Sequence, residues 1–156
     1  MQLAARTCQT RHNRTDGNAG DVRDFFVEAA RKRLERLPLT PLETIAADWI
    51  EAHPEYAADL GDAEAARAAT YPAGGGRENP FLHLSMHLSI SEQVAIDQPA
   101  GIRPAFESLV ARLGSLHAAQ HEVMECLGTM LWEAQRSGRP PDGAAYVDCV
   151  RRRATR

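Results

Sequence analysis

The sequence predicts an all-α fold: a single-domain helical bundle of about five to seven helices over residues 21–153, preceded by a flexible N-terminal tail, residues 1–20. The apolar residues are mainly Ala and Leu, and aromatic residues make up only 6% of the chain, which favours helices. Apolar residues recur at helical spacing between recognisable caps, and no segment alternates as a half-buried strand would. A length of 156 residues suits one domain with its own core.

The first helix is expected over residues 21–37. Asp21 can cap it, and Pro38 ends it. Its basic run, Arg31 to Arg36, contains an acidic residue and has another nearby, as a solvated helix face does. Apolar residues approximate the 3.6-residue spacing of a buried stripe; they are Val22, Phe25, Phe26, Ala29, Leu34 and Leu37.

The second helix has a clear N-terminal signal. Thr40 is the expected N-cap, Pro41 occupies the first helical position, and Glu43 completes a capping box. The buried stripe consists of Leu42, Ile45, Ala46 and Trp49. His53 and the proline after it are expected to close the helix. An Ala-rich helical piece over residues 54–69 follows, broken near Gly61.

The remaining helices follow a glycine-rich loop, residues 70–79. This loop lacks the preceding strand and the G-K-[ST] sequence that a phosphate-binding loop requires. Asn79 as cap and Pro80 open a helix that runs to about residue 96. Further helices are expected to end at residue 113, to run from 115 to about 136, and to lie around 146–150.

Composition and charge exclude several classes of protein. The net charge of −3 argues against a general nucleic-acid-binding protein. A weaker alternative is a nucleic-acid-associated factor that uses Arg31–Arg36 and the C-terminal arginines. The three cysteines, Cys8, Cys126 and Cys149, are odd in number and widely separated, which favours a reducing compartment without a disulfide framework. No membrane span or signal peptide is expected, so we predict a cytoplasmic protein; the sequence leaves a protein partner and the oligomeric state open.

Two histidines interrupt an otherwise apolar segment, NPFLHLSMHLSISEQ, at residues 79–93. At about 100° per residue, His87 lies about 40° from His83, within the same arc as Ile90 and Val94. Both imidazoles should therefore face the core, where each unsatisfied polar group costs about 1–3 kcal/mol. A partner for these rings is required.

A second histidine stripe occurs in SLHAAQHEVMECL, residues 115–127. His117, His121 and Glu125 follow one another at intervals of four residues and lie at about 0°, 40° and 80° around the helix. This stripe falls at the edge of the buried face. If the two helices pack antiparallel, it can meet the first pair of histidines.

The candidate metal ligands are therefore His83, His87, His117, His121 and Glu125. Imidazole and carboxylate groups suit a transition metal ion such as Zn, Fe, Ni, Co or Mn, and helical bundles build such sites from inward-facing side chains. The alternative is a small interaction or regulatory protein in which the histidines form only a buried hydrogen-bond network with Glu125, Glu92, Gln120 or backbone.

Other chemistries remain open but match less well. A zincin-type protein would need Glu125 in place of the second histidine of H-E-x-x-H, with Glu122 as base. Ferritin-like di-iron sites need Glu-x-x-His pairs, which the chain lacks. A hemerythrin-like arrangement shares only the spacing of His121 and Glu125. Non-covalent bis-histidine haem and acid–base catalysis also stay open, and no catalytic residue is assigned.

Three long motifs resemble an uncharacterised family of short proteobacterial proteins that is known only as a domain of unknown function. They are NPFLHLSMHLSISEQ, HAAQHEVMECL and WEAQRSGRPPDGAAYVDCVRR. The resemblance covers about Asp21 to Arg153, including LTPLETIAADWIEAHPEY. It implies a small cytoplasmic helical protein and brings no activity with it.

Overall fold

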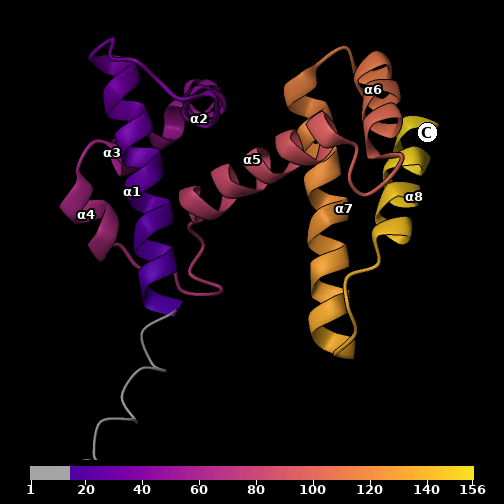
Figure 1. The fold of residues 1–156 in the computed structure, drawn as a ribbon. Coiled ribbons are helices and arrows are strands. Elements are labelled where there is room, and N and C mark those ends of the chain that lie inside the picture. Colours follow the sequence, from indigo (N-terminus) through magenta and orange to yellow (C-terminus); the bar gives the residue numbers. More distant parts are fainter. Residues whose placement is uncertain (1–14) are drawn as a thin grey trace, which may run out of the picture.

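The computed structural model describes residues 15–156, and all of its regular elements are helices (Figure 1). They are α1 (Thr15–Leu34), α2 (Pro41–Glu51), the 3-10 turn η1 (Pro54–Tyr56), α3 (Ala57–Leu60), α4 (Ala63–Ala68), α5 (Pro80–Ile96), α6 (Ile102–Leu113), α7 (Leu116–Ser137) and α8 (Gly143–Ala154). The all-α prediction is confirmed. The described residues contain eight α-helices, more than the five to seven expected.

The additional helices come from the Ala-rich segment between α2 and α5. It divides at Gly61 into α3 and α4, because the Asp62 carboxylate caps α4 by accepting from the N–H groups of Glu64 at 2.9 Å and Ala65 at 3.1 Å. Helix α1 also differs from expectation. It begins at Thr15 and so includes the end of the expected tail, residues 1–20; the rest of that tail lies outside the described residues.

The helix caps agree with the sequence pattern. Thr40 and Glu43 form the capping box, with the Glu43 N–H donating to Thr40 Oγ1 at 3.2 Å and the Thr40 N–H donating to Glu43 Oε2 at 2.9 Å. Asn79 Oδ1 accepts from the first turn of α5, and Ser115 Oγ accepts from the first turn of α7. Because these caps satisfy N–H groups that have no partner inside the helix, they determine where α2, α5 and α7 begin.

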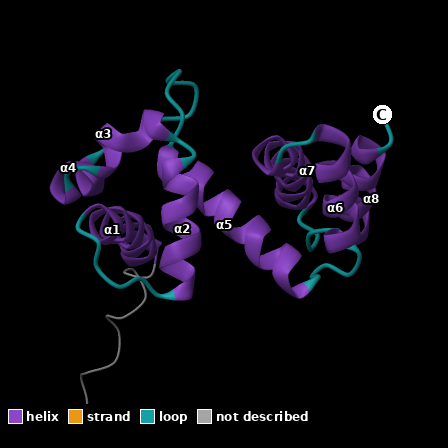
Figure 2. Cartoon of the chain, turned by 90° about the horizontal axis from the view of Figure 1, so that it is seen from above, coloured by secondary structure: helices purple, strands orange, loops and turns teal. Residues whose placement is uncertain are grey.

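The helices gather in two groups on either side of α5 (Figures 1 and 2), and each group encloses a hydrophobic core. The first is built mainly by α1, α2, α4 and the start of α5, and its largest members are Phe26, Trp49, Tyr56, Phe81 and Leu84. The second is built by the end of α5 with α6, α7 and α8, and its members include Ile90, Ile102, Leu109, Val123 and Tyr146. Helix α5 therefore contributes to both cores, and His87 lies on this helix between them.

A disulfide joins α7 to α8. Cys126 and Cys149 are bonded with a Cα–Cα distance of 5.9 Å, within the range that a disulfide bridges. The expectation of a chain without disulfides is thus corrected for this pair, whereas Cys8 lies outside the described residues. The two cysteines are 23 residues apart, so only the packing of α7 on α8 brings them together.

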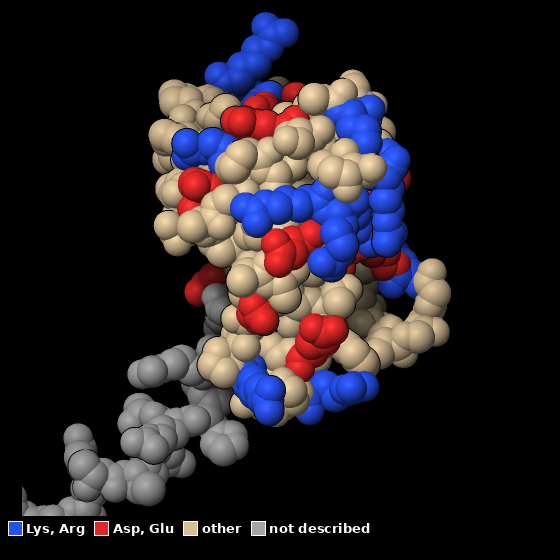
Figure 3. Space-filling model, turned by 90° about the vertical axis from the view of Figure 1, so that its right-hand side faces the viewer, with Lys and Arg blue, Asp and Glu red and all other residues tan. Residues whose placement is uncertain are grey.

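The surface mixes charges of both signs. On the side that carries α6 and α8, Lys and Arg side chains gather in a band with acidic groups between them (Figure 3).

Over residues 15–156, none of the helices combines the length and the apolar character needed to cross a membrane.

Candidate metal centre

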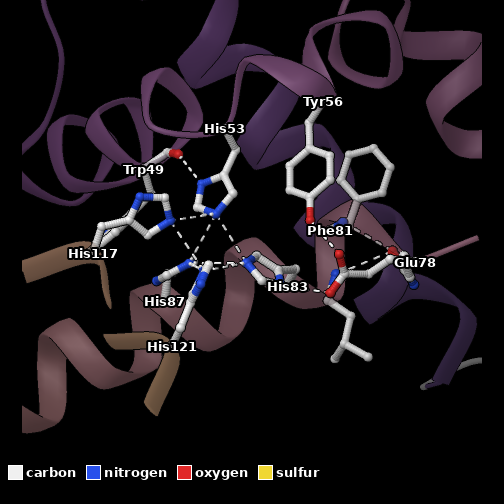
Figure 4. Close-up of polar contacts among 11 residues, drawn as sticks. Trp49, His53, Tyr56, Glu78, Phe81, His83, His87, His117 and His121 are labelled. Atoms are coloured by element: carbon white, nitrogen blue, oxygen red, sulfur yellow. Dashed lines mark hydrogen bonds and ion pairs between the residues drawn. The ribbon is translucent and has the colours of Figure 1, made fainter. Parts of the chain in front are cut away.

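Five histidines from three parts of the chain point toward one another where α2, α5 and α7 meet (Figure 4). His83 and His87 lie one turn apart on α5, and His117 and His121 lie one turn apart on α7. A spacing of four residues places each pair on one face of its helix. The fifth, His53, follows the C-terminus of α2.

The Nε2 atoms of all five rings take part in the cluster. The Nε2 atom of His83 lies 3.1 Å from those of His53 and His87. The Nε2 atom of His121 lies 3.2 Å from those of His83, His87 and His117. The Nε2 atom of His53 lies 3.2 Å from that of His117 and 3.3 Å from that of His87. Ligand atoms of His53, His83, His87 and His121 all lie within 4.8 Å of one another. His117 completes the group from one side, since its Nε2 contacts only two of the others.

His53 is oriented by the helix that it follows. Its Nδ1 lies 2.7 Å from the carbonyl oxygen of Trp49, and its ring stacks on Tyr56 with 5.3 Å between centroids and 2° between planes. The ring is 2% exposed. Because a carbonyl oxygen can only accept, Nδ1 carries the proton and Nε2 presents its lone pair to the cluster.

His83 is oriented by an acidic side chain at the rim of the site. Its Nδ1 lies 2.8 Å from Glu78 Oε1, and the hydroxyl of Tyr56 donates to Glu78 Oε2 at 2.8 Å. Partial burial opposes ionisation of Glu78, but these hydrogen bonds and the nearby imidazoles lower its pKa. The carboxylate therefore accepts from Nδ1–H, and Nε2 of His83 also faces the cluster as an acceptor.

His87 is held by a closed set of hydrogen bonds. Its Nδ1 lies 2.8 Å from Gln120 Oε1, while Gln120 Nε2 donates to Ser91 Oγ at 3.0 Å. Trp49 Nε1 also donates to Ser91 Oγ at 3.0 Å, and its ring system stacks on His87 with 4.0 Å between centroids. Because the Gln120 amide nitrogen is used by Ser91, its oxygen must accept from Nδ1–H of His87, and the tautomer is determined.

These three orientations have a direct consequence for the centre of the site. In their neutral forms, His53, His83 and His87 each present a lone pair, yet their Nε2 atoms lie 3.1–3.3 Å apart in all three combinations. Two acceptors cannot hydrogen-bond to each other. Protons on the other two rings cannot satisfy every contact, because a ring nitrogen carries a single proton or a single lone pair. A cation at the shared centre would satisfy all of them.

Burial favours the neutral form of three of the rings, His87, His117 and His121. It lowers the pKa of His87 to about 3, with the neighbouring imidazoles acting in the same direction. Burial also lowers the pKa of His117 and of His121. Neutral imidazole is the form that binds a metal ion.

The distances suit a metal centre. Two nitrogens bound at about 2.1 Å to one ion lie about 3.0 Å apart at a right angle and about 3.4 Å apart at a tetrahedral angle. The observed Nε2–Nε2 contacts of 3.1–3.3 Å fall between these values. A metal-ligating histidine also typically donates its other N–H to a carboxylate or carbonyl oxygen, as His53, His83 and His87 do.

The structure brings together four of the five residues expected from the sequence and places the fifth elsewhere. Glu125 lies further along α7 with its side chain 68% exposed, and its Oε2 pairs with Arg153 of α8 at 2.7 Å. The drift of about 40° per four residues carries it away from α5. The sequence interpretation missed His53, although it lies four residues after Trp49 and thus continues the buried stripe of α2.

The fold and site define an all-α protein with a partly buried polyhistidine cluster. The chain belongs to the family described as Domain of unknown function (DUF1841), whose model matches residues 18–152. The predicted resemblance to an uncharacterised domain family is therefore confirmed. No curated protein and no solved structure matches the chain significantly.

Proposed function

We propose that this protein binds one divalent transition metal ion through His53, His83, His87 and His121, with His117 as a fifth ligand. The observation that carries the proposal is the set of three lone pairs facing one another at 3.1–3.3 Å. A hydrogen-bond network arranges donors opposite acceptors, and these three rings present acceptors only.

The donor set favours particular metals. All five side chains offer imidazole nitrogen, which suits Zn, Fe, Ni, Co and Cu, whereas Mg, Ca and Mn favour carboxylate and carbonyl oxygen. Glu78, whose carboxylate contacts the cluster, is engaged by Tyr56 and by Nδ1 of His83. We therefore expect zinc, nickel, cobalt or iron to bind more tightly than manganese, and magnesium not to bind.

Metal binding is tested by calorimetric titration of chelator-treated, dialysed protein with Zn²⁺, Ni²⁺, Co²⁺, Mn²⁺ and Mg²⁺, together with elemental analysis of the protein as purified. The test variant is His83→Ala with His121→Ala, which removes two partly exposed rings and spares buried His87. The matched control is Glu92→Ala with Glu125→Ala, which changes one exposed metal-capable side chain on each of the same two helices. Circular dichroism checks that both variants fold.

We expect one ion per wild-type chain, retention in the control, and loss of binding in the folded test variant. Failure of all five ions to bind the wild type, or equal binding by the test variant, would overturn the proposal. In the first case the remaining candidate is the small interaction protein with a structural histidine network.

A further inference from the structure

A second feature that could support chemistry lies between α7 and α8, outside the histidine cluster. It is a cavity of about 530 Å³ whose lining includes both cysteines of the disulfide. Apolar side chains such as Met130 and Ala134 form part of the lining. Three arginines also line it, namely Arg136, Arg139 and Arg152.

The arginines give this cavity a positive character. Within residues 15–156, none of the three forms an ion pair with a carboxylate, whereas the neighbouring Arg151 and Arg153 of α8 are paired with Asp148 and with two glutamates of α7. Arg136 instead lies over the ring of Trp132, 4.8 Å from its centroid.

Two carboxylates line the same cavity but do not cancel this charge. One belongs to Glu133. The other, Asp142, is the N-cap of α8, where its Oδ1 accepts from the Ala145 N–H at 3.0 Å. The lining therefore carries three guanidinium groups against two carboxylates, one of which is engaged by the helix. Guanidinium groups favour anionic ligands.

The two sulfurs differ in access. Cys126 is 2% exposed and belongs to the second core, whereas Cys149 is only partly buried. A nucleophile in the cavity would therefore reach Sγ of Cys149, with Sγ of Cys126 as the leaving atom. Nearby guanidinium groups stabilise thiolates, both the one that attacks and the one that leaves.

We propose that this cavity is a site for an anionic low-molecular-weight thiol, which exchanges with the Cys126–Cys149 disulfide. A thiolate forms a bond to Sγ of Cys149 as the protein S–S bond breaks, and Cys126 leaves as a thiolate that takes up a proton. A second thiolate attacks the mixed disulfide, forms the external disulfide and releases the Cys149 thiolate, which also takes up a proton. Two thiols are oxidised and one protein disulfide is reduced, and no metal takes part.

The test compares two small thiols of different charge on the whole protein. The rate of disulfide reduction is measured at low ionic strength with 2-mercaptoethanesulfonate, which is anionic, and with 2-mercaptoethanol, which is neutral. Samples are quenched by alkylation and analysed by intact mass, and each rate is divided by the thiolate concentration. The anionic-to-neutral rate ratio is then compared with that of the same protein unfolded in urea, where the cavity does not exist.

We expect the ratio to be about tenfold higher in the folded protein than in the unfolded chain, and to fall as salt screens the arginines. Arg139→Gln with Arg152→Gln should reduce the ratio toward the unfolded value. The charge-matched control, Arg67→Gln with Arg77→Gln, changes two arginines outside the cavity and should leave it unchanged. Equal ratios in folded and unfolded protein, no effect of the cavity variant, or Cys126 and Cys149 found as free thiols in air-oxidised protein would each overturn the proposal.

Discussion

Acidification of the metal-free protein should weaken the fold well above the pH at which carboxylates are protonated. His87 is fully buried against Trp49, and burial lowers its pKa to about 3. The imidazole of an unfolded chain has a pKa of about 6.5. Between these two values the unfolded chain binds a proton that the folded chain does not, so a fall in pH favours unfolding. The stabilisation is complete above about pH 6.5 and is lost as the pH falls toward 3.

The magnitude follows from this interval. One histidine that becomes charged only on unfolding reduces the free energy of unfolding by up to about 1.4 kcal/mol for each unit of pH. From pH 6.5 to 4.5, His87 alone thus accounts for up to about 2.7 kcal/mol. His117 and His121, whose pKa values are also lowered by burial, act in the same direction. Carboxylates with lowered pKa values contribute mainly below about pH 4.5, so this interval isolates the imidazoles.

The assay is urea unfolding followed by circular dichroism at pH 7.5, 6.5, 5.5 and 4.5, with a chelator present. His87→Gln is the control, because its amide can still pair with Gln120 but does not titrate. We expect the pH dependence of this variant to be shallower than that of the wild type by about 1.4 kcal/mol per unit. The reasoning fails if the wild type is equally stable at pH 7.5 and 4.5, or if both proteins lose stability in parallel.

Three further outcomes are expected. Glu78→Gln should weaken metal binding about 10–100-fold in calorimetry, because the carboxylate orients the His83 ring and raises its basicity. The control Glu55→Gln, at an exposed neighbouring position, should leave metal binding unchanged. In a Trp132→Phe background, Ni²⁺ should quench the fluorescence of Trp49, which stacks on His87 of the proposed site at 4.0 Å between centroids. Unchanged emission at saturating Ni²⁺ would contradict the site. Leu109→Ala should lower the free energy of unfolding by about 2–5 kcal/mol in urea titration, since this side chain is 0% exposed in the second core, and a loss below 1 kcal/mol would refute that packing.

Helix boundaries were predictable where a side chain caps the helix locally. Thr40, Asn79 and Ser115 each bond to backbone within three residues, so their effect is independent of the tertiary structure. The start of α1 was not predictable in this way. Asp21 has the chemistry of a cap, yet it lies inside a helix that begins at Thr15.

The same distinction between local and tertiary interactions separates the site residues that were predicted from those that were not. Periodicity within α5 and within α7 identified His83, His87, His117 and His121, because four-residue spacing is a local property of a helix. Which residue joins them depends on packing between helices. His53 joins the cluster because the end of α2 packs on α5. Glu125 stays outside the cluster and pairs with Arg153 of α8 instead. The disulfide between α7 and α8 was not predicted either, because it also depends on how helices pack on one another.

The location of the cluster would couple the proposed metal binding to the assembly of the two cores. His53 belongs to the first half of the molecule, and His117 and His121 belong to α7 in the second. Among the helices of residues 15–156, only α5 contributes to both cores. Neither half contains the complete donor set, so the centre exists only when α2 and α7 are both packed on α5. An ion bound to all five rings would stabilise that packing by RT ln(1 + c/Kd), where c is the concentration of free ion, because the unfolded chain has no such preformed site. Without the ion, three lone pairs face one another where the halves meet, and this is where we expect the metal-free protein to open first.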